Sequence, residues 1–103
     1  MPYDKRELFD ERGFRCECGC GNFARDAHHA LIGRRKRFPE LDCPENIVLV
    51  NHDEHLLRKF DNQEWRKKFW LIQVDRYGLE RMTAWVNSLP DKLKYRIDFI
   101  EGR

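Results

Sequence analysis

The segment from Asp26 to Leu57 constrains the fold more than any other part of the chain. It holds all four histidines and also the apolar run Ile47-Val48-Leu49-Val50. A short run rich in β-branched residues predicts a buried strand. Residues 27–32 have strand character as well, and residues 33–45 carry glycine, two prolines and no periodicity, which predicts a loop. The segment therefore predicts a strand, a loop and a second strand that close as a hairpin.

Helix signals flank this hairpin. Residues 4–11 predict a short helix closed by Gly13. Asn51, with Glu54 three residues later, forms a capping box that begins a helix over about 52–60. Asp61 with Glu64 repeats the pattern and predicts a second helix over 62–77, which ends before Gly78.

The C-terminal part adds further elements. The helix at 62–77 carries a wide apolar stripe, and a third helix is expected over 79–88, stopped by Pro90. The inward residues are expected to be Trp65, Phe69, Leu71, Ile72, Val74 and Tyr77 in one helix and Leu79, Met82, Trp85, Val86 and Leu89 in the other. Leu93, Tyr95, Ile97 and Phe99 alternate with polar residues, which predicts a strand.

The size and composition favour one folded domain over residues 1–103. The chain has 103 residues, 41% hydrophobic and 37% charged, with three Trp, seven Phe and three Tyr. Disordered chains are poor in aromatics, so a packed core is expected. The chain contains no long apolar run, so no transmembrane helix is expected. The N-terminus also lacks the apolar stretch of a signal peptide. We therefore expect a cytoplasmic location, where four cysteines favour free thiols or metal over disulfides.

The net charge is only +2, but the basic residues are clustered. One block is Arg34, Arg35, Lys36 and Arg37, and the other is Arg58, Lys59, Arg66, Lys67 and Lys68. A single block is readily explained as a solvated face. Two blocks that flank a histidine cluster favour a phosphate-rich partner.

The histidines suggest metal-assisted hydrolysis. His28 and His29 are neighbours on a strand and so point to opposite sides, while His55 falls in the first turn of the expected helix. A helix N-terminus favours a negative charge such as phosphate. Neutral imidazole binds metal ions and also accepts a proton near neutral pH. One histidine can therefore activate water while a metal ion polarises a phosphoryl oxygen.

These residues resemble a known family. "DAHH", "PENIVLV" and "HDEH" are similar to the HNH (His-Asn-His) nuclease motif, with Asn46 nine residues before His55. The stretch "ELFDERGFRCECG" also resembles the helix and cysteine turn that often precede such a core. The resemblance covers about residues 7–60 and implies an α+β fold. Its ββα-metal core would span about 14–60, with a helical extension over 61–103.

The resemblance also implies roles. His29 would be the general base that deprotonates the attacking water, and Asn46 would hold the loop and orient His29. His28 and His55 would bind one divalent ion, Mg²⁺ or Mn²⁺, with Ni²⁺ or Zn²⁺ as substitutes in crystals. DNA would be the substrate, contacted by Arg34, Arg35, Lys36, Arg37 and Lys59. Compact relatives encoded by bacteriophages imply a packaging partner such as terminase, and the protein would act as a monomer or dimer.

Two departures from the family leave alternatives open. Lys59 stands where many relatives have a further ligand, so His52 or water would have to fill that place. The two CxxC pairs of zinc-containing relatives are replaced by Cys16, Cys18 and Cys20, with Asn51 and Glu54 at the later positions. Zinc on these thiols, with Cys43 or His52 as the fourth ligand, competes with a reduced cysteine turn. The alternative function is a non-catalytic, zinc-stapled nucleic-acid-binding module; a colicin-type toxin nuclease would require a delivery segment, which we do not see.

Overall fold

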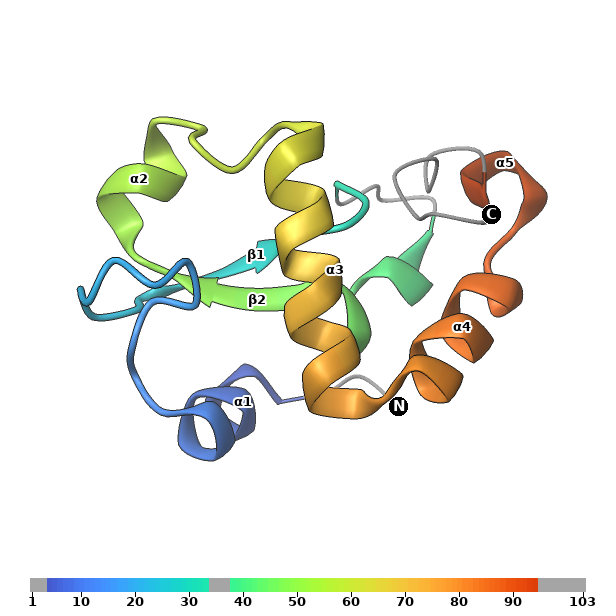
Figure 1. The fold of residues 1–103 in the computed structure, drawn as a ribbon, viewed down its shortest axis with the longest axis horizontal. Helices are drawn as coiled ribbons and strands as arrows, with labels where there is room; N and C mark the ends of the chain where they lie inside the picture. Colours follow the sequence, from blue (N-terminus) through green and yellow to red (C-terminus); the bar gives the residue numbers. More distant parts are fainter. Residues whose placement is uncertain (1–3, 34–37, 95–103) are drawn as a thin grey trace.

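The computed structural model describes residues 4–33 and 38–94, and this part of the chain is α+β. Figure 1 shows a two-stranded hairpin surrounded by helices. In chain order the elements are α1 (Lys5–Arg12), β1 (Asp26–His29), the 3₁₀ turns η1 (Pro39–Leu41) and η2 (Pro44–Asn46), β2 (Ile47–Val50), α2 (His52–Leu56), α3 (Gln63–Tyr77), α4 (Leu79–Ser88) and α5 (Asp91–Lys94). The expected hairpin with helices after it is confirmed. No helix in the described ranges is long and apolar enough to cross a membrane.

The two strands pair antiparallel, with Asp26 opposite Val50 and His29 opposite Ile47. All four residues of β2 are fully buried. Neighbouring side chains of a strand point to opposite faces. Val48 and Val50 accordingly join the core built with α3 and α4, whereas Ile47 and Leu49 pack with α1. Burial on both faces explains why β2 is an unbroken apolar run rather than an alternating one.

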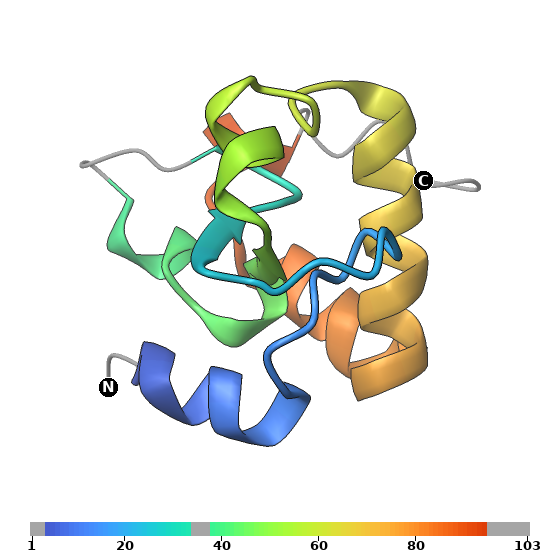
Figure 2. The same ribbon diagram turned by 90° about the vertical axis from the view of Figure 1, so that its left-hand side faces the viewer.

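The helices cover the hairpin from different sides. In Figures 1 and 2, α3 crosses one face of the hairpin, and α1 lies on the other side of the hairpin from α3. α4 packs on α3, and α2 lies against β1. The main core contains Phe69 and Trp70 of α3, Met82 and Trp85 of α4, and Phe60 from the turn before α3.

The capping side chains largely agree with the sequence patterns. The Asp4 side chain accepts a hydrogen bond from the Arg6 amide at 2.8 Å, and Gly13 ends α1 with φ of 83°. Asn51 Oδ1 accepts from the Glu54 amide at 2.8 Å, as the capping box predicts. The predicted cap of α3 was wrong by one residue. The cap is Asn62, whose Oδ1 accepts from the Trp65 amide at 2.9 Å.

Two elements end earlier than predicted. β1 ends at His29 and not at Ile32, because the amides of Leu31 and Ile32 donate to the Asn46 side chain instead of to a strand ladder. α2 ends at Leu56 and not near residue 60. Arg58 adopts a φ of 60°, in the left-handed region, which cannot continue a right-handed helix. The loop at 33–45 also contains η1 and the start of η2.

Other corrections concern the C-terminal helices. Leu71 and Leu79, expected inside, are 66% and 60% exposed, whereas Gln73 is fully buried. Leu93 and Lys94 belong to α5 and not to a strand, since the Leu93 amide donates to the Pro90 carbonyl. Tyr95, Ile97 and Phe99 lie outside the described residues.

Gln73 is buried because its amide serves the backbone around η2. Its Nε2 lies 2.9 Å from the carbonyl oxygens of Pro44 and Glu45 and 3.0 Å from that of Ile47. We expect Gln73→Leu to lower the free energy of unfolding by about 3 kcal/mol, because buried carbonyls lose their donor. Gln63→Leu, an exposed substitution on the same helix, should change it by less than about 0.5 kcal/mol. Urea denaturation of both variants measures this difference, and equal effects would contradict the assigned role.

Candidate functional site

The strand β1 separates the two adjacent histidines. His28 pairs in register with Val48 and lies on the same face, with its ring centroid 6.0 Å from that of Phe69. His29 turns to the opposite side, where its Nε2 is 3.0 Å from Asp42 Oδ1. The opposite orientation expected for a strand is therefore what the structure has.

The helix α2 brings His55 against His28. Their ring centroids are 4.9 Å apart. His28 is 6% exposed, and within the described ranges its Nε2 is a buried nitrogen without a hydrogen-bond partner. Burial, together with the nearby charge of His55, lowers the pKa of His28 to about 4. His28 is therefore neutral near pH 7, which is the form of imidazole that binds metal ions.

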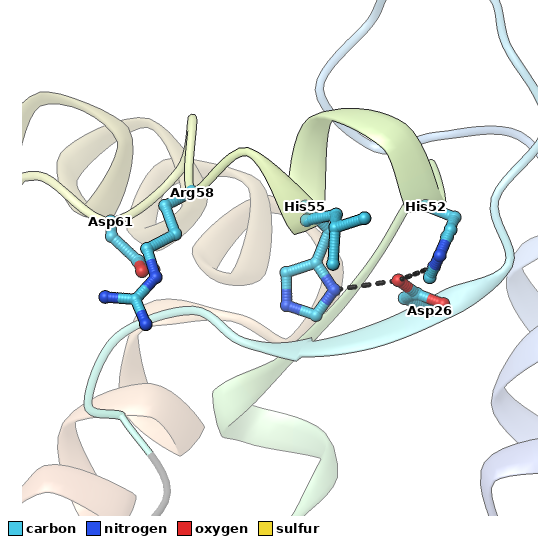
Figure 3. Close-up of a pocket in the computed structure, with 6 residues that line it drawn as sticks. Asp26, His52, His55, Arg58 and Asp61 are labelled. Atoms are coloured by element: carbon cyan, nitrogen blue, oxygen red, sulfur yellow. Dashed lines mark hydrogen bonds and ion pairs between the residues drawn. The ribbon is translucent and has the colours of Figure 1, made fainter.

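Asp26 joins the two histidines of α2, as Figure 3 shows. Its Oδ2 lies 2.8 Å from His55 Nδ1 and 2.9 Å from His52 Nδ1. Burial alone would raise the pKa of Asp26, but the hydrogen bonds from His55 and His52 outweigh it and lower that pKa. An ionised carboxylate can only accept, so Nδ1 of His55 donates this hydrogen bond, and Nε2 is the ring nitrogen that points away from Asp26.

A surface pocket opens beside these residues. Its lining consists of Asp26, His52, His55, Leu56, Arg58 and Asp61. In Figure 3, Arg58 and Asp61 lie on one side of His55, and Asp26 and His52 lie on the other. The sequence reasoning missed Asp26 and Asp61 and placed Arg58 only in a basic block. Asp26 could have been found from the sequence, because it lies two residues before His28 on the expected strand and such residues share a face.

Asn46 holds the loop between the strands. It is fully buried, and its Oδ1 accepts hydrogen bonds from the amides of Leu31 and Ile32, both at 3.0 Å. Its Nδ2 donates to the carbonyls of Ile32 and Leu41 at 2.8 and 2.9 Å. Its own carbonyl accepts from the Ala30 amide, next to His29. The side chain is thus engaged with backbone groups at both ends of the loop.

The cysteine turn, residues 16–20, packs at the C-terminal end of β2, opposite to the end that Asn46 precedes. The sulfurs of Cys16, Cys18 and Cys20 lie within 4.8 Å of one another, so they can hold a metal ion such as zinc. Gly19 and Gly21, with φ of 89° and 86°, allow the tight turn that brings the three cysteines together. Cys43 and His52, the two expected fourth ligands, are not in this group, and neither is Glu54, whose Oε1 lies 3.9 Å from Cys18 Sγ.

Lys59 lies close to the turn but is already paired. Its Nζ donates to the Glu54 carboxylate, and this hydrogen bond lowers the pKa of Glu54. A phosphate would therefore compete with Glu54 for Lys59. Arg34, Arg35, Lys36 and Arg37 lie outside the described residues, so the structure does not place them relative to the pocket.

Comparison with known proteins adds nothing to this geometry. No family model, curated protein or solved structure matches the chain. The site is therefore defined by its own contacts alone.

Cys43 offers a test of the local environment. Burial raises the pKa of its thiol to about 11 from an ordinary 9.0. The thiolate is the reactive form, so at pH 8 we expect alkylation of Cys43 in the native protein to be about 100-fold slower than in urea. The native rate should rise with pH until about pH 11. Mass spectrometry of iodoacetamide-treated peptides measures both rates; equally fast alkylation in the native protein would contradict the burial.

Proposed function

We propose that the chain is a metal-dependent HNH endonuclease that hydrolyses DNA phosphodiester bonds, with β1, β2 and α2 as a ββα-metal core. The observation that carries this proposal is the meeting of His28 and His55. One ring comes from the strand and the other from the helix, 4.9 Å apart, and His28 carries a buried nitrogen with no hydrogen-bond partner among the described residues. A buried polar atom without a partner is costly, which favours a ligand at this point.

The donor set fits a divalent ion. His28 and His55 would hold it, and Asp26 would orient His55 through Nδ1, as carboxylates commonly do behind a metal-binding histidine. The ion would polarise a phosphoryl oxygen and stabilise the leaving oxygen. Imidazole suits ions such as Zn²⁺ and Ni²⁺, whereas Mg²⁺ and Mn²⁺ prefer oxygen, so phosphate and water would have to complete the shell for the latter pair.

His29 would act as the general base. Its Nε2 lies 3.0 Å from the Asp42 carboxylate. With Nε2 protonated and donating a hydrogen bond to Asp42, Nδ1 would be the nitrogen that takes a proton from water. Asp42 would thus be a positioning residue, and the loop that carries it is held by Asn46.

Arg58 would contact phosphate from the pocket wall, and the basic residues Arg34, Arg35, Lys36 and Arg37 would add further phosphate contacts. Contacts to phosphate position a duplex without reading its sequence. A partner such as a packaging protein would supply sequence specificity.

The test is cleavage of supercoiled plasmid by the purified protein with Mg²⁺, Mn²⁺, Ni²⁺, Zn²⁺ or EDTA. We expect nicking or linearisation in the presence of an ion, and none in EDTA. His29→Ala should slow cleavage by about 100-fold or more, the usual contribution of a general base, while leaving the fold and DNA binding intact.

Asn87→Ala on α4, an exposed polar position outside the site, is the matched control and should cleave like the parent. Circular dichroism checks folding and a gel shift checks DNA binding. Retained DNA binding without cleavage under any ion would refute the nuclease and favour the non-catalytic binding module.

Asp26 provides a second test of the same site. We expect Asp26→Asn to lower metal affinity and cleavage by about 10- to 100-fold, because His55 loses the carboxylate that orients it. Asp53→Asn removes the same charge from an exposed position of α2 and serves as the control. Isothermal titration with Mn²⁺ and the plasmid assay measure the two effects. If both variants lose metal affinity and cleavage equally, Asp26 acts only through its negative charge and not by orienting His55.

A further inference from the structure

We propose that Glu54 of α2 is the fourth ligand of a zinc ion bound by Cys16, Cys18 and Cys20. The three sulfurs lie within 4.8 Å of one another, and Glu54 Oε1 lies 3.9 Å from Cys18 Sγ. The site therefore joins the N-terminal cysteine turn to the helix that follows β2. This proposal does not depend on the nuclease activity.

Two of the separations lie near those of a tetrahedral zinc site. Zinc binds thiolate sulfur at about 2.3 Å and carboxylate oxygen at about 2.1 Å. Two sulfurs on one zinc ion are then about 3.8 Å apart, and a sulfur and an oxygen about 3.6 Å apart. Cys16 Sγ and Cys18 Sγ are 3.2 Å apart, and the Cys18–Glu54 separation is 3.9 Å, which differ by about 0.6 Å and about 0.3 Å from the zinc-site values.

Hydrogen-bond donors are directed at two of the three sulfurs. The backbone amide of Asn51 donates to Cys16 Sγ at 3.2 Å, and Asn51 Nδ2 lies 3.3 Å from Cys16 Sγ and 3.5 Å from Cys20 Sγ. Donors directed at sulfur stabilise its negative form, and each thiol gives up its proton when the metal ion binds. Asn51 thus supports the ligands without being one.

Glu54 is already oriented for this role. Its Oε1 accepts from Asn51 Nδ2 at 2.7 Å on the thiol side, and its Oε2 accepts from Lys59. One oxygen is therefore available to a metal ion, and the other is held by a cation that offsets the charge of three thiolates. A hydrogen-bonded outer partner of this kind is usual behind a ligating carboxylate.

The two fourth ligands considered from sequence are placed elsewhere. Cys43 precedes η2 and β2, whereas the thiols meet the far end of that strand, where the Glu17 amide donates to the Leu49 carbonyl. β2 has four residues at about 3.3 Å each, which separates the two ends by roughly 10 Å. His52 uses its Nδ1 on Asp26.

The experiment is a metal titration in a His28→Ala/His55→Ala background, which removes the proposed histidine site. Zinc content per chain is measured by mass spectrometry after dialysis, and affinity by competition with a chromophoric chelator. We expect one zinc ion per chain. With Co²⁺ in its place, we expect sulfur-to-metal absorption in the near ultraviolet.

Glu54→Gln keeps the length of the side chain but removes its charge, and we expect at least tenfold weaker zinc binding. Asp53→Asn is the matched control, because it removes one carboxylate charge from an exposed position of the same helix and keeps Glu54; it should bind within about twofold of the background. Cys43→Ser and His52→Ala should also bind like the background. Glu54→Cys restores a sulfur ligand, so it should keep one ion per chain and strengthen the near-ultraviolet absorption.

Three results would overturn the proposal. The first is less than one ion per chain with no cobalt–sulfur absorption. The second is Glu54→Gln binding as tightly as the background. The third is loss of the ion on Cys43→Ser, which would make Cys43 the fourth ligand. Plasmid cleavage plays no part in these readouts, so they stand whether or not the chain proves to be a nuclease.

Discussion

The burial of β2 on both faces is the constraint on which the rest of the structure depends. A two-stranded hairpin is not stable alone in water, so both of its faces must be covered. α1 covers Ile47 and Leu49, and the helices after β2 cover Val48 and Val50. Because the chain leaves β2 directly into α2, the covering elements also bring His55 over His28. The same packing that stabilises the strand therefore assembles the histidine pair.

Covering such a short sheet leaves many backbone groups buried without a ladder partner. Polar side chains satisfy several of these groups. Asn46 bonds backbone at both ends of its loop, Gln73 serves the carbonyls around η2, and Arg12 reaches the carbonyls of Ile47 and Pro44 at 2.6 and 3.2 Å. Buried backbone groups must be paired, so these side chains take the place of the additional strands that a larger sheet would supply.

Much of the local structure was predictable, because it depends on neighbouring residues. The cap by Asn51, the stop at Gly13 and the helix at 79–88 each follow from a short pattern. The faces of α3 were not predictable in the same way. Gln73 is inside and Leu71 outside because of where η2 lies, and η2 is distant in sequence. A periodicity argument assigns the apolar residue to the core and has no means of detecting a carbonyl that needs a donor.

The residues of the candidate site also fall into those that the sequence identified and those that it missed. His28, His29, Asn46 and His55 stood out as residue types at suggestive spacings, and the structure brings His28 and His55 together. Asp26 and Asp42 did not stand out, since a carboxylate on a charged chain is ordinary until its partner is known. Their importance lies in the atoms they meet, His55 Nδ1 and His29 Nε2, and those meetings depend on the early end of β1 and on the folded loop.

The short helix α2 links the two proposed sites physically. Glu54 and His55 are consecutive, so the helix turns one side chain toward the cysteine turn and the next toward Asp26 and His28. A helix of five residues is too short to be stable by itself. Its orientation must come from contacts at its ends and sides, and the Asn51 cap supplies only part of them. A metal ion shared by Glu54 and the thiols would fix the first turn of α2 against β2, and it would thereby fix the direction in which His55 points.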